Sequence, residues 1–309
     1  MRDRRPMTDD RQGLWWMGLV ILWMVIFLSA CTAPAVGTPP VIETGVDPQA
    51  WASIPAGEFL YGAHNAEINL DHAFEMMVTD VTNAQYADYL NQALAVGKEK
   101  IVEDQIVGYY PGDEFYGVKH EREIAAGDWL HVNLTEANLR IANNQGVFSA
   151  YPEYANHPAT MVTWFGAQAY CRFYGWRLPT EMEWEKTARG TDGRPFPWGD
   201  AIALNNANYY SSHDIFEKTF GSSGDTTPVG FFNGKTYAGY LTLDSASPYG
   251  LYDMAGNVWQ WTGDIYEGQH YRYLRGGSKA DYEYNLRSFT RNSAGPDYYS
   301  PNVGFRCAR

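Results

Sequence analysis

Apolar and polar positions follow a helical period most clearly after residue 81. A helix is predicted to begin at Thr82 and to continue to about Leu94, with Tyr86, Leu90 and Leu94 forming its apolar stripe. Thr82 and Gln85 have the spacing of a capping box, in which each side chain binds the other residue's backbone amide. The stripe therefore predicts an amphipathic helix with one face in a core.

Two further helices are predicted in close succession. Thr163 is suited to cap a helix over residues 164–174, which Gly175 would end. The segment Thr180-Glu181-Met182-Glu183 forms a second capping box. We expect that helix to end at Gly190, in the left-handed conformation that glycine tolerates best.

The strand signals are weaker than the helical ones. Alternating positions predict an edge strand over residues 54–62 and a second strand over residues 74–81. Residues 97–156 are poorly periodic and rich in Gly, Asp, Glu and Tyr, so we expect a long loop there, with short strands near residues 116–118 and 129–132. Turns and short strands should follow the third helix. The fold class is therefore α+β with a low content of regular secondary structure.

The N-terminal residues have the pattern of a targeting segment. Arginines within residues 1–13 precede an apolar run over residues 14–28, which ends at Leu28-Ser29-Ala30-Cys31. This arrangement resembles a bacterial lipoprotein signal, because the run of about 15 residues is shorter than the roughly 20 that a spanning helix needs. An uncleaved membrane anchor is the alternative.

The domain organisation follows from this interpretation. We predict a signal peptide over residues 1–30, a lipid on Cys31, a flexible tether over residues 31–50 and one domain over residues 51–309. Either form of attachment places the domain outside the cytoplasm, in the periplasm or at the cell surface. The expected partner is thus a membrane, reached through the lipid anchor.

Charge narrows the classes of partner. The chain has 23 basic and 36 acidic residues, a net charge of -13, and 45% hydrophobic residues, which suffice for a large core. Such an acidic chain is not expected to bind nucleic acid, since the phosphate backbone would repel it. A solvated exterior, metal cations or cationic partners all suit this charge.

The cysteine count suggests one crosslink. With Cys31 assigned to the lipid, Cys171 and Cys307 remain, and an oxidising compartment favours a disulfide between them. Two buried free thiols are the alternative.

Several short motifs occur in an order that is characteristic of one family. They lie in residues 54–62, Val81-Thr82-Asn83-Ala84-Gln85-Tyr86, Arg177-Leu178-Pro179-Thr180-Glu181-Met182-Glu183-Trp184-Glu185, Pro197-Trp198-Gly199, Thr227-Pro228-Val229-Gly230, residues 250–261, Leu274-Arg275-Gly276-Gly277-Ser278 and Asn302-Val303-Gly304-Phe305-Arg306-Cys307. Residues 51–309 therefore resemble the formylglycine-generating enzyme family, also called the sulfatase-modifying factor domain, a variant of the C-type lectin fold. The resemblance implies the same disulfide between Cys171 and Cys307.

The resemblance also defines what is missing. The enzyme that names the family oxidises a substrate cysteine with two copper-binding cysteines that follow Gly-Gly-Ser. Counted from Ser278, those positions hold Asp281 and, without a gap, Leu286. Neither side chain supplies the soft thiolate that Cu(I) prefers, so no copper is expected. The seven histidines lack the spacing that would place two metal ligands on one helical face.

Calcium sites are implied by the same resemblance. One set of matching positions is Asp253, Gly256, Val258 and Gln260, where glutamine in place of glutamate removes a negative charge. A second set is Asn208, Tyr209 and Asp225. Carboxylate, amide and carbonyl oxygens are the ligands that calcium takes. The alternative is that Asp253 and Asn257 merely cap turns.

Two functions of different class remain open. The preferred hypothesis is a binding or structural module that takes a protein, peptide or glycan ligand at the segment after Ser278, where Tyr282, Tyr284, Phe289, Tyr298 and Tyr299 alternate with polar residues.

The alternative is a periplasmic oxidoreductase of the same fold. Asp281, Arg287, Arg291 and Trp259 would then line its pocket. The other interpretation of Arg287, Arg291 and Arg306 is that they are internal props, whose guanidinium groups bind loop carbonyls.

Overall fold

The computed structural model describes residues 37–119, 121–217, 224–266 and 270–309. The predicted signal peptide and Cys31 lie outside the described residues. Residues 38–309 form one compact unit. Within the described ranges, none of the helices has the length and apolar character needed to cross a membrane.

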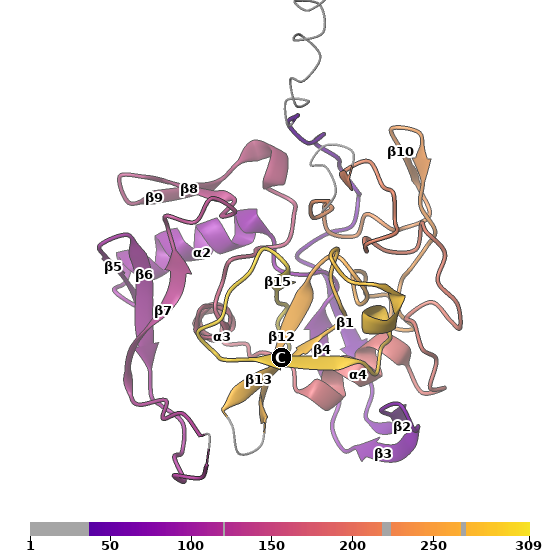
Figure 1. Cartoon of the computed structure of the whole chain (residues 1–309), viewed down its shortest axis with the longest axis horizontal. Helices are drawn as coiled ribbons and strands as arrows, with labels where there is room; N and C mark the ends of the chain where they lie inside the picture. The colour runs from indigo at the N-terminus through magenta and orange to yellow at the C-terminus, as the bar shows by residue number, and fades with distance from the viewer. Residues whose placement is uncertain (1–36, 120, 218–223, 267–269) are drawn as a thin grey trace, which may run out of the picture. The chain divides into compact units, whose positions relative to one another are not determined.

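Short strands and three α-helices make up this unit (Figure 1). In chain order they are β1 (Trp51–Ile54), β2 (Gly57–Tyr61), β3 (Ala66–Leu70), β4 (Phe74–Met77), α2 (Asn83–Ala95), β5 (Glu99–Val102), β6 (Gln105–Tyr110), β7 (Gly127–Asn133), β8 (Ile141–Asn144), β9 (Val147–Ala150), α3 (Trp164–Phe173), α4 (Glu181–Arg189), β10 (Thr236–Tyr237), β11 (Tyr240–Leu241), β12 (Trp259–Tyr266), β13 (Tyr271–Arg275), β14 (Arg291–Ala294) and β15 (Val303–Gly304). This α+β content, with few regular elements, confirms the predicted class.

All three helices form where the capping signals predicted them. Thr82 and Gln85 complete a capping box at α2, with the Thr82 amide 2.8 Å from the Gln85 side-chain oxygen. Thr180 and Glu183 do the same at α4, where the Thr180 amide lies 2.7 Å from Glu183 Oε2. Gly190 ends α4 with φ of 71°, although its ψ of -138° lies outside the left-handed helical region. Local signals were sufficient here because each cap binds residues three positions away.

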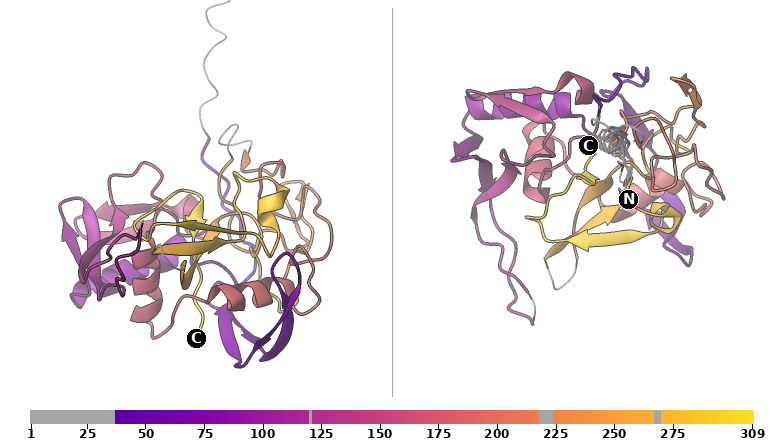
Figure 2. Two further views of the ribbon diagram at one scale, coloured as in Figure 1. Left: turned by 60° about the horizontal axis from the view of Figure 1, so that its bottom comes forward. Right: turned by 45° about the horizontal axis from the view of Figure 1, so that its top comes forward.

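A four-stranded sheet in the order β14-β13-β12-β15 joins the C-terminal motifs. Gln260 of β12 pairs with Arg275 of β13 on one side and, in parallel, with Gly304 of β15 on the other. In Figures 1 and 2, α2 and strands β5–β9 lie to one side of this sheet, and α4 with β2 and β3 lies to the other. The motifs at residues 250–261, 274–278 and 302–307 therefore meet in this sheet.

The predicted edge strand is two strands in the structure. Pro55 and Ala56 interrupt it, so that β1 pairs with β4 and β2 pairs with β3. Proline lacks the amide hydrogen that a continuous ladder would need. The second predicted strand is shorter than expected, since β4 ends at Met77.

The prediction of a long loop over residues 97–156 was wrong, because much of this segment is β-structure. It contains the three-stranded sheet β5-β6-β7 and the hairpin β8-β9, while residues 116–118 form no strand and residues 129–132 lie within β7. Both hairpins turn through two residues, and Glu103 and Gln145 adopt positive φ in those turns. Such turns usually hold Asn or Gly at that position, so the residue types concealed them.

Residues 38–50, which were predicted to be part of the flexible tether, belong to the compact unit. Thr44 is buried, and its hydroxyl donates to the Val229 carbonyl at 3.0 Å. The Thr44 carbonyl accepts hydrogen bonds from Asn233, Lys235 and Tyr237. The domain therefore begins before residue 51.

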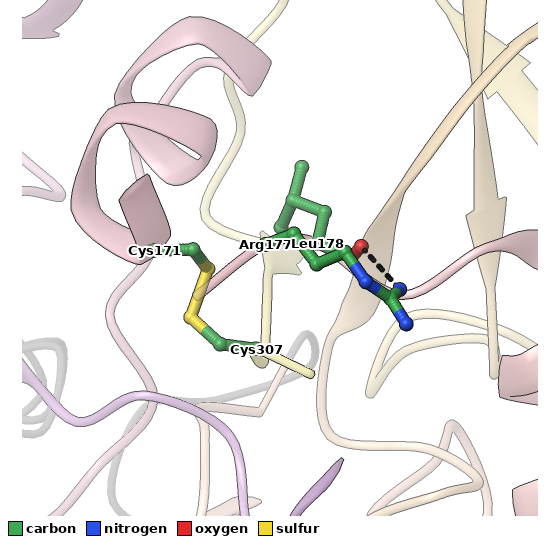
Figure 3. Close-up of a disulfide and its surroundings, with 4 residues drawn as sticks. All are labelled: Cys171, Arg177, Leu178 and Cys307. Carbon is green, nitrogen blue, oxygen red and sulfur yellow. Dashed lines mark hydrogen bonds between the residues drawn. A yellow bond between two sulfur atoms is a disulfide. The ribbon is translucent and has the colours of Figure 1, made fainter. Parts of the chain in front are cut away.

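A disulfide joins Cys171, near the end of α3, to Cys307 in the C-terminal segment (Figure 3). Their Cα atoms are 5.7 Å apart, and both residues are fully buried. The bond is adjacent to Arg177 and Leu178, where the chain leaves α3 for α4. It confirms the predicted pairing and fixes the last motif of the chain against the helix.

Candidate functional site

Asp281 is the residue that the sequence predicts at the first of the two cysteine positions. Its carboxylate accepts four hydrogen bonds. Oδ2 binds Trp259 Nε1 at 2.8 Å and both the amide and the hydroxyl of Ser278, at 3.0 and 2.5 Å, while Oδ1 binds Asn285 Nδ2 at 2.6 Å. The side chain therefore fixes the Gly-Gly-Ser turn and the loop that follows it.

A cavity of about 330 Å³ lies beside this carboxylate. Trp259 of β12, Leu274 of β13 and residues 292–294 of β14 line it, together with Asp281 and Tyr298. Strands of the central sheet thus line one part of the cavity, and the segment after Ser278 lines another part. Trp259 and Asp281 are brought together as predicted.

The other predicted pocket residues lie elsewhere. Leu286, at the second cysteine position, is fully buried in a cluster with Phe196, Ala207, Tyr209 and Ala255. Arg291 lines a separate cavity with Tyr61 and Glu181, and its side chain is 53% exposed. Its pairing along β14 takes it away from Asp281, which sequence distance alone does not show.

Arg287 does not join Asp281 either. Its guanidinium lies 5.1 Å from the Tyr284 ring. Of the three arginines proposed as internal props, Arg306 is one, because it is fully buried and binds the carbonyls of Met77, Val78 and Tyr252. The pocket predicted from four residues is therefore defined by two of them.

The first calcium set does not fit a calcium ion. Gln260 Oε1 accepts from Trp184 Nε1 at 2.7 Å and from the Arg306 guanidinium at 2.8 Å, and its amide donates to the Asp253 carbonyl. Asp253 Oδ2 accepts from the Gly230 amide at 2.7 Å, and burial raises the pKa of Asp253 to about 6. These side-chain oxygens already have donors, and the positive charge beside them belongs to Arg306.

That set also contains Gly256 and Val258, whose roles are set by backbone packing. Gly256 has φ of 80°, and a Cβ there would lie 2.4 Å from the Asn208 carbonyl oxygen. Val258 is fully buried. Asn257, which also has positive φ, binds the amide and carbonyl of Thr227 and so does cap a turn.

The second calcium set is divided. Asn208 Oδ1 is buried and has no hydrogen-bond partner among the described residues, as a free ligand oxygen would. The Tyr209 carbonyl accepts from the Ser212 amide, and the Asp225 carboxylate faces Arg140 and Tyr154. Of this set, Asn208 therefore has the one side-chain oxygen without a donor among the described residues.

Exposed aromatic rings follow the Gly-Gly-Ser turn, as the binding hypothesis requires. Tyr282, Tyr284 and Tyr298 are 63, 61 and 47% exposed. Tyr282 lies against Tyr210, with ring centroids 4.7 Å apart. Phe289 and Tyr299 are partly buried. The segment thus presents three of its five aromatic side chains to solvent.

Sequence reasoning missed the buried charges around α4. Arg275 is fully buried and binds the carboxylates of Glu181 and Glu185 and the Ser288 carbonyl. Glu181 and Glu185 are four positions apart on α4, which places both on one face. Two acids at that spacing, together with an arginine at the end of a strand, were the available signal.

Comparisons with known proteins identify the family of this chain. Residues 41–309 match the family described as the sulfatase-modifying factor enzyme 1-like domain. The chain belongs to this family. This member is 32% identical over 289 residues to the formylglycine-generating enzyme of Mus musculus, covering 82% of this chain and 73% of the relative.

A second relative of this chain has a different name. It is the inactive C-alpha-formylglycine-generating enzyme 2 of Bos taurus, which is 33% identical over 252 residues and covered over 76% of each chain. The fold is also similar to that of PvdO from Pseudomonas aeruginosa, with a TM-score of 0.55, 19% identity, and coverage of 88% of this chain and 98% of that one. Relatives of this chain thus include both a formylglycine-generating enzyme and a protein named as an inactive one.

Proposed function

We propose that this sulfatase-modifying factor domain is a lipid-anchored, extracytoplasmic binding module without copper-cysteine oxidase chemistry. The observation that carries the proposal is the Asp281 carboxylate, whose four hydrogen bonds give it a structural role at the first cysteine position. The buried Leu286 side chain supports it, because a thiolate pair cannot be formed from these two residues.

The aromatic segment supports binding as the remaining role. Exposed tyrosines supply contact area at little cost in conformational entropy, and neighbouring polar residues supply adaptable hydrogen bonds. Tyr282, Tyr284 and Tyr298 are such residues, and Tyr298 also lines the cavity beside Asp281. We infer that the ligand contacts this segment.

Metal analysis and an oxidation assay test the proposal directly. The full chain, purified in detergent, is incubated with Cu(I) and a cysteine-containing peptide, and conversion to formylglycine is followed by mass spectrometry. The mouse formylglycine-generating enzyme serves as the positive control. We expect no conversion and no stoichiometric copper, whereas stoichiometric copper or iron together with product would overturn the proposal.

The lipid anchor rests on the sequence around Cys31 and needs its own experiment. Expression of the wild-type chain and of Cys31→Ala in a bacterial host, followed by membrane fractionation, should show the wild type in the membrane fraction. Mass spectrometry of the N-terminal peptide should find a diacylglyceryl group on Cys31. An unmodified, uncleaved N-terminus in the wild type would favour the membrane-anchor alternative.

We also propose calcium at the second predicted set, Asn208, Tyr209 and Asp225, where the unpartnered Asn208 Oδ1 supports it. Thermal melting of the full chain with calcium and with chelator provides the test. We expect a higher melting temperature with calcium, and the increase should disappear in Asn208→Ala. Equal melting temperatures in the wild type would contradict the proposal.

A further inference from the structure

A second cavity lies on the other side of the segment that follows Ser278. Its volume is about 330 Å³, which suits one small ligand or one unit of a larger one. Distant parts of the chain form its wall: Asn138 and Arg140, Thr160, residues 224–226, residues 279–280 and residues 301–302. Ala280 and Asn302 line both this cavity and the one beside Asp281.

Lys279 is a buried cation in this cavity, and its ammonium group has few hydrogen-bond partners among the described residues. It is 9% exposed, and its ammonium donates one hydrogen bond, to Asn302 Oδ1 at 2.7 Å. Among the described residues it forms no ion pair with a carboxylate. An ammonium group has three donors, and a buried positive charge is costly unless a negative group meets it.

Arg140 and Asp225 form the rest of the charged lining. Arg140 Nη2 lies 3.4 Å from Asp225 Oδ2, and its guanidinium stacks 4.3 Å from the Tyr154 ring. Asp225 also accepts from the Tyr154 hydroxyl at 2.8 Å and from the Thr226 amide at 2.7 Å. Because Arg140 and Asp225 offset each other, the lining carries one positive charge in excess.

The uncharged part of the lining combines four polar side chains with Gly224, Ala280 and Pro301. Asn138, Asn302, Thr160 and Thr226 contribute amides and hydroxyls, and no aromatic side chain lies among the lining residues described. Amides, hydroxyls and a carboxylate together can pair with ligand hydroxyl groups, each of which both donates and accepts.

We propose that this cavity binds an acidic sugar, with Lys279 and Arg140 holding its carboxylate. Asp225, Asn138 and Asn302 then bind the sugar hydroxyls. The inference rests on the proposed binding function and names the ligand as an acidic glycan. A carboxylate would give the Lys279 ammonium a charged partner, which it lacks among the described residues, and such charge-assisted hydrogen bonds are the stronger ones.

Binding of tetragalacturonate to the full chain in detergent, measured by calorimetry, tests the proposal. The fully methyl-esterified tetramer has the same size and hydroxyl pattern but no charge. We expect the acid form to bind at least about tenfold more tightly than the ester, and Lys279→Met to reduce its affinity by at least about tenfold. Arg140→Met should weaken binding as well, which keeps the test independent of one variant.

Matched controls separate this binding from surface charge. Lys100, which is 58% exposed and paired with Asp128, offers the control substitution Lys100→Met, and it should leave the affinity unchanged. Melting curves of each variant confirm folding. An undetectable affinity of the wild type, equal binding of acid and ester, or an unchanged affinity in Lys279→Met would overturn the inference.

Two further outcomes identify what has failed. Preferential binding of acetyl-Gly-Ala, a peptide with a free carboxylate, would assign the cavity to a peptide terminus and contradict the sugar. Stoichiometric copper with formylglycine formation would contradict the proposed function whatever the glycan result. Absence of glycan binding in copper-free, inactive protein would contradict this inference alone.

Discussion

Arg275 and Lys279 lie at the two ends of the Gly-Gly-Ser turn, and their positive charges have different partners in the structure. Arg275 is fully buried between Glu181 and Glu185 of α4 and also binds the Ser288 carbonyl. Lys279 is nearly as buried, yet it binds one neutral oxygen of Asn302. One cation beside this turn is therefore neutralised by carboxylates of the domain, whereas the other meets no carboxylate among the described residues.

The contrast separates a structural charge from a binding charge. A buried cation that lies between carboxylates of its own domain is neutralised there, and its removal leaves those carboxylates buried without their counterion. A buried ion with free donors destabilises the domain until a ligand arrives. We therefore expect substitution at Arg275 to affect stability, and substitution at Lys279 to affect ligand affinity.

The largest effect is expected for Arg275→Met. It leaves the Glu181 and Glu185 carboxylates buried without their cation, and breaking a buried pair in this way costs about 3 to 5 kcal/mol. Urea unfolding of the full chain measures the loss. Arg194→Met is the control, because that arginine pairs at the surface with Asp192, which is 55% exposed, and such pairs contribute little. A loss below about 1 kcal/mol at Arg275 would contradict the comparison.

A smaller loss is expected for Asp281→Ala, which tests whether the first cysteine position has become structural. The substitution leaves donors of Trp259, Ser278 and Asn285 without their acceptor, at a cost of about 2 to 3 kcal/mol. Asp281→Asn keeps one acceptor oxygen and should cost less. Unfolding midpoints in urea provide the measurement, and equal stability of wild type and Asp281→Ala would remove the structural role.

His270 lies between the two extremes, since its charge depends on pH. Its ring nitrogens lie 3.0 Å from Asp113 Oδ2 and 2.6 Å from Glu121 Oε1, and Arg272 also binds Asp113. Burial lowers the pKa of His270, but the hydrogen bonds to Glu121 and Asp113 outweigh it and raise the pKa above 6.5.

The direction of the pH effect follows from that raised pKa. The folded state holds the proton more tightly than the unfolded state, so the stabilisation is complete below pH 6.5 and is lost as the pH rises through the folded pKa. Urea unfolding of wild type and His270→Gln between about pH 5.5 and about 9 should show the difference between them shrinking with rising pH. A difference that is constant or grows would mean that His270 is neutral in the fold.

The sequence predicted these features unevenly, and the reason is the range of the interactions. The helix caps at Thr82 and Thr180 involve neighbours three positions away, so they could be read locally. The hairpins at Glu103 and Gln145 were missed because residues that rarely take positive φ occupy their turns. Local pattern was informative only where the residue types matched the backbone conformation.

The candidate site was harder to predict, because it depends on contacts between distant strands and loops. The family resemblance placed Asp281 beside Trp259 correctly, since Trp259 lies in β12 and Asp281 closely follows the motif at the end of β13. It placed Arg291 wrongly, because the pairing of β14 with β13 carries that residue toward Tyr61 and Glu181. The unpaired ammonium of Lys279 follows from the positions of Asn302 and Asp225, which no local pattern encodes.

The smallest stability change, and the one that opposes the others in sign, is expected for Lys279→Met. Burial lowers the pKa of Lys279 below its ordinary value of 10.5, so the folded state binds the proton less tightly than the unfolded state. Removing the charge should leave stability unchanged or raise it by up to about 1 kcal/mol near pH 7. The gain should shrink as the pH rises toward 10.5, where the wild-type lysine loses its proton in the unfolded state too. Urea unfolding of both proteins at about pH 7 and about pH 10, without glycan, measures this difference. A loss as large as that of Arg275→Met would show that Lys279 has partners within the domain, and the two ends of the turn would then be alike.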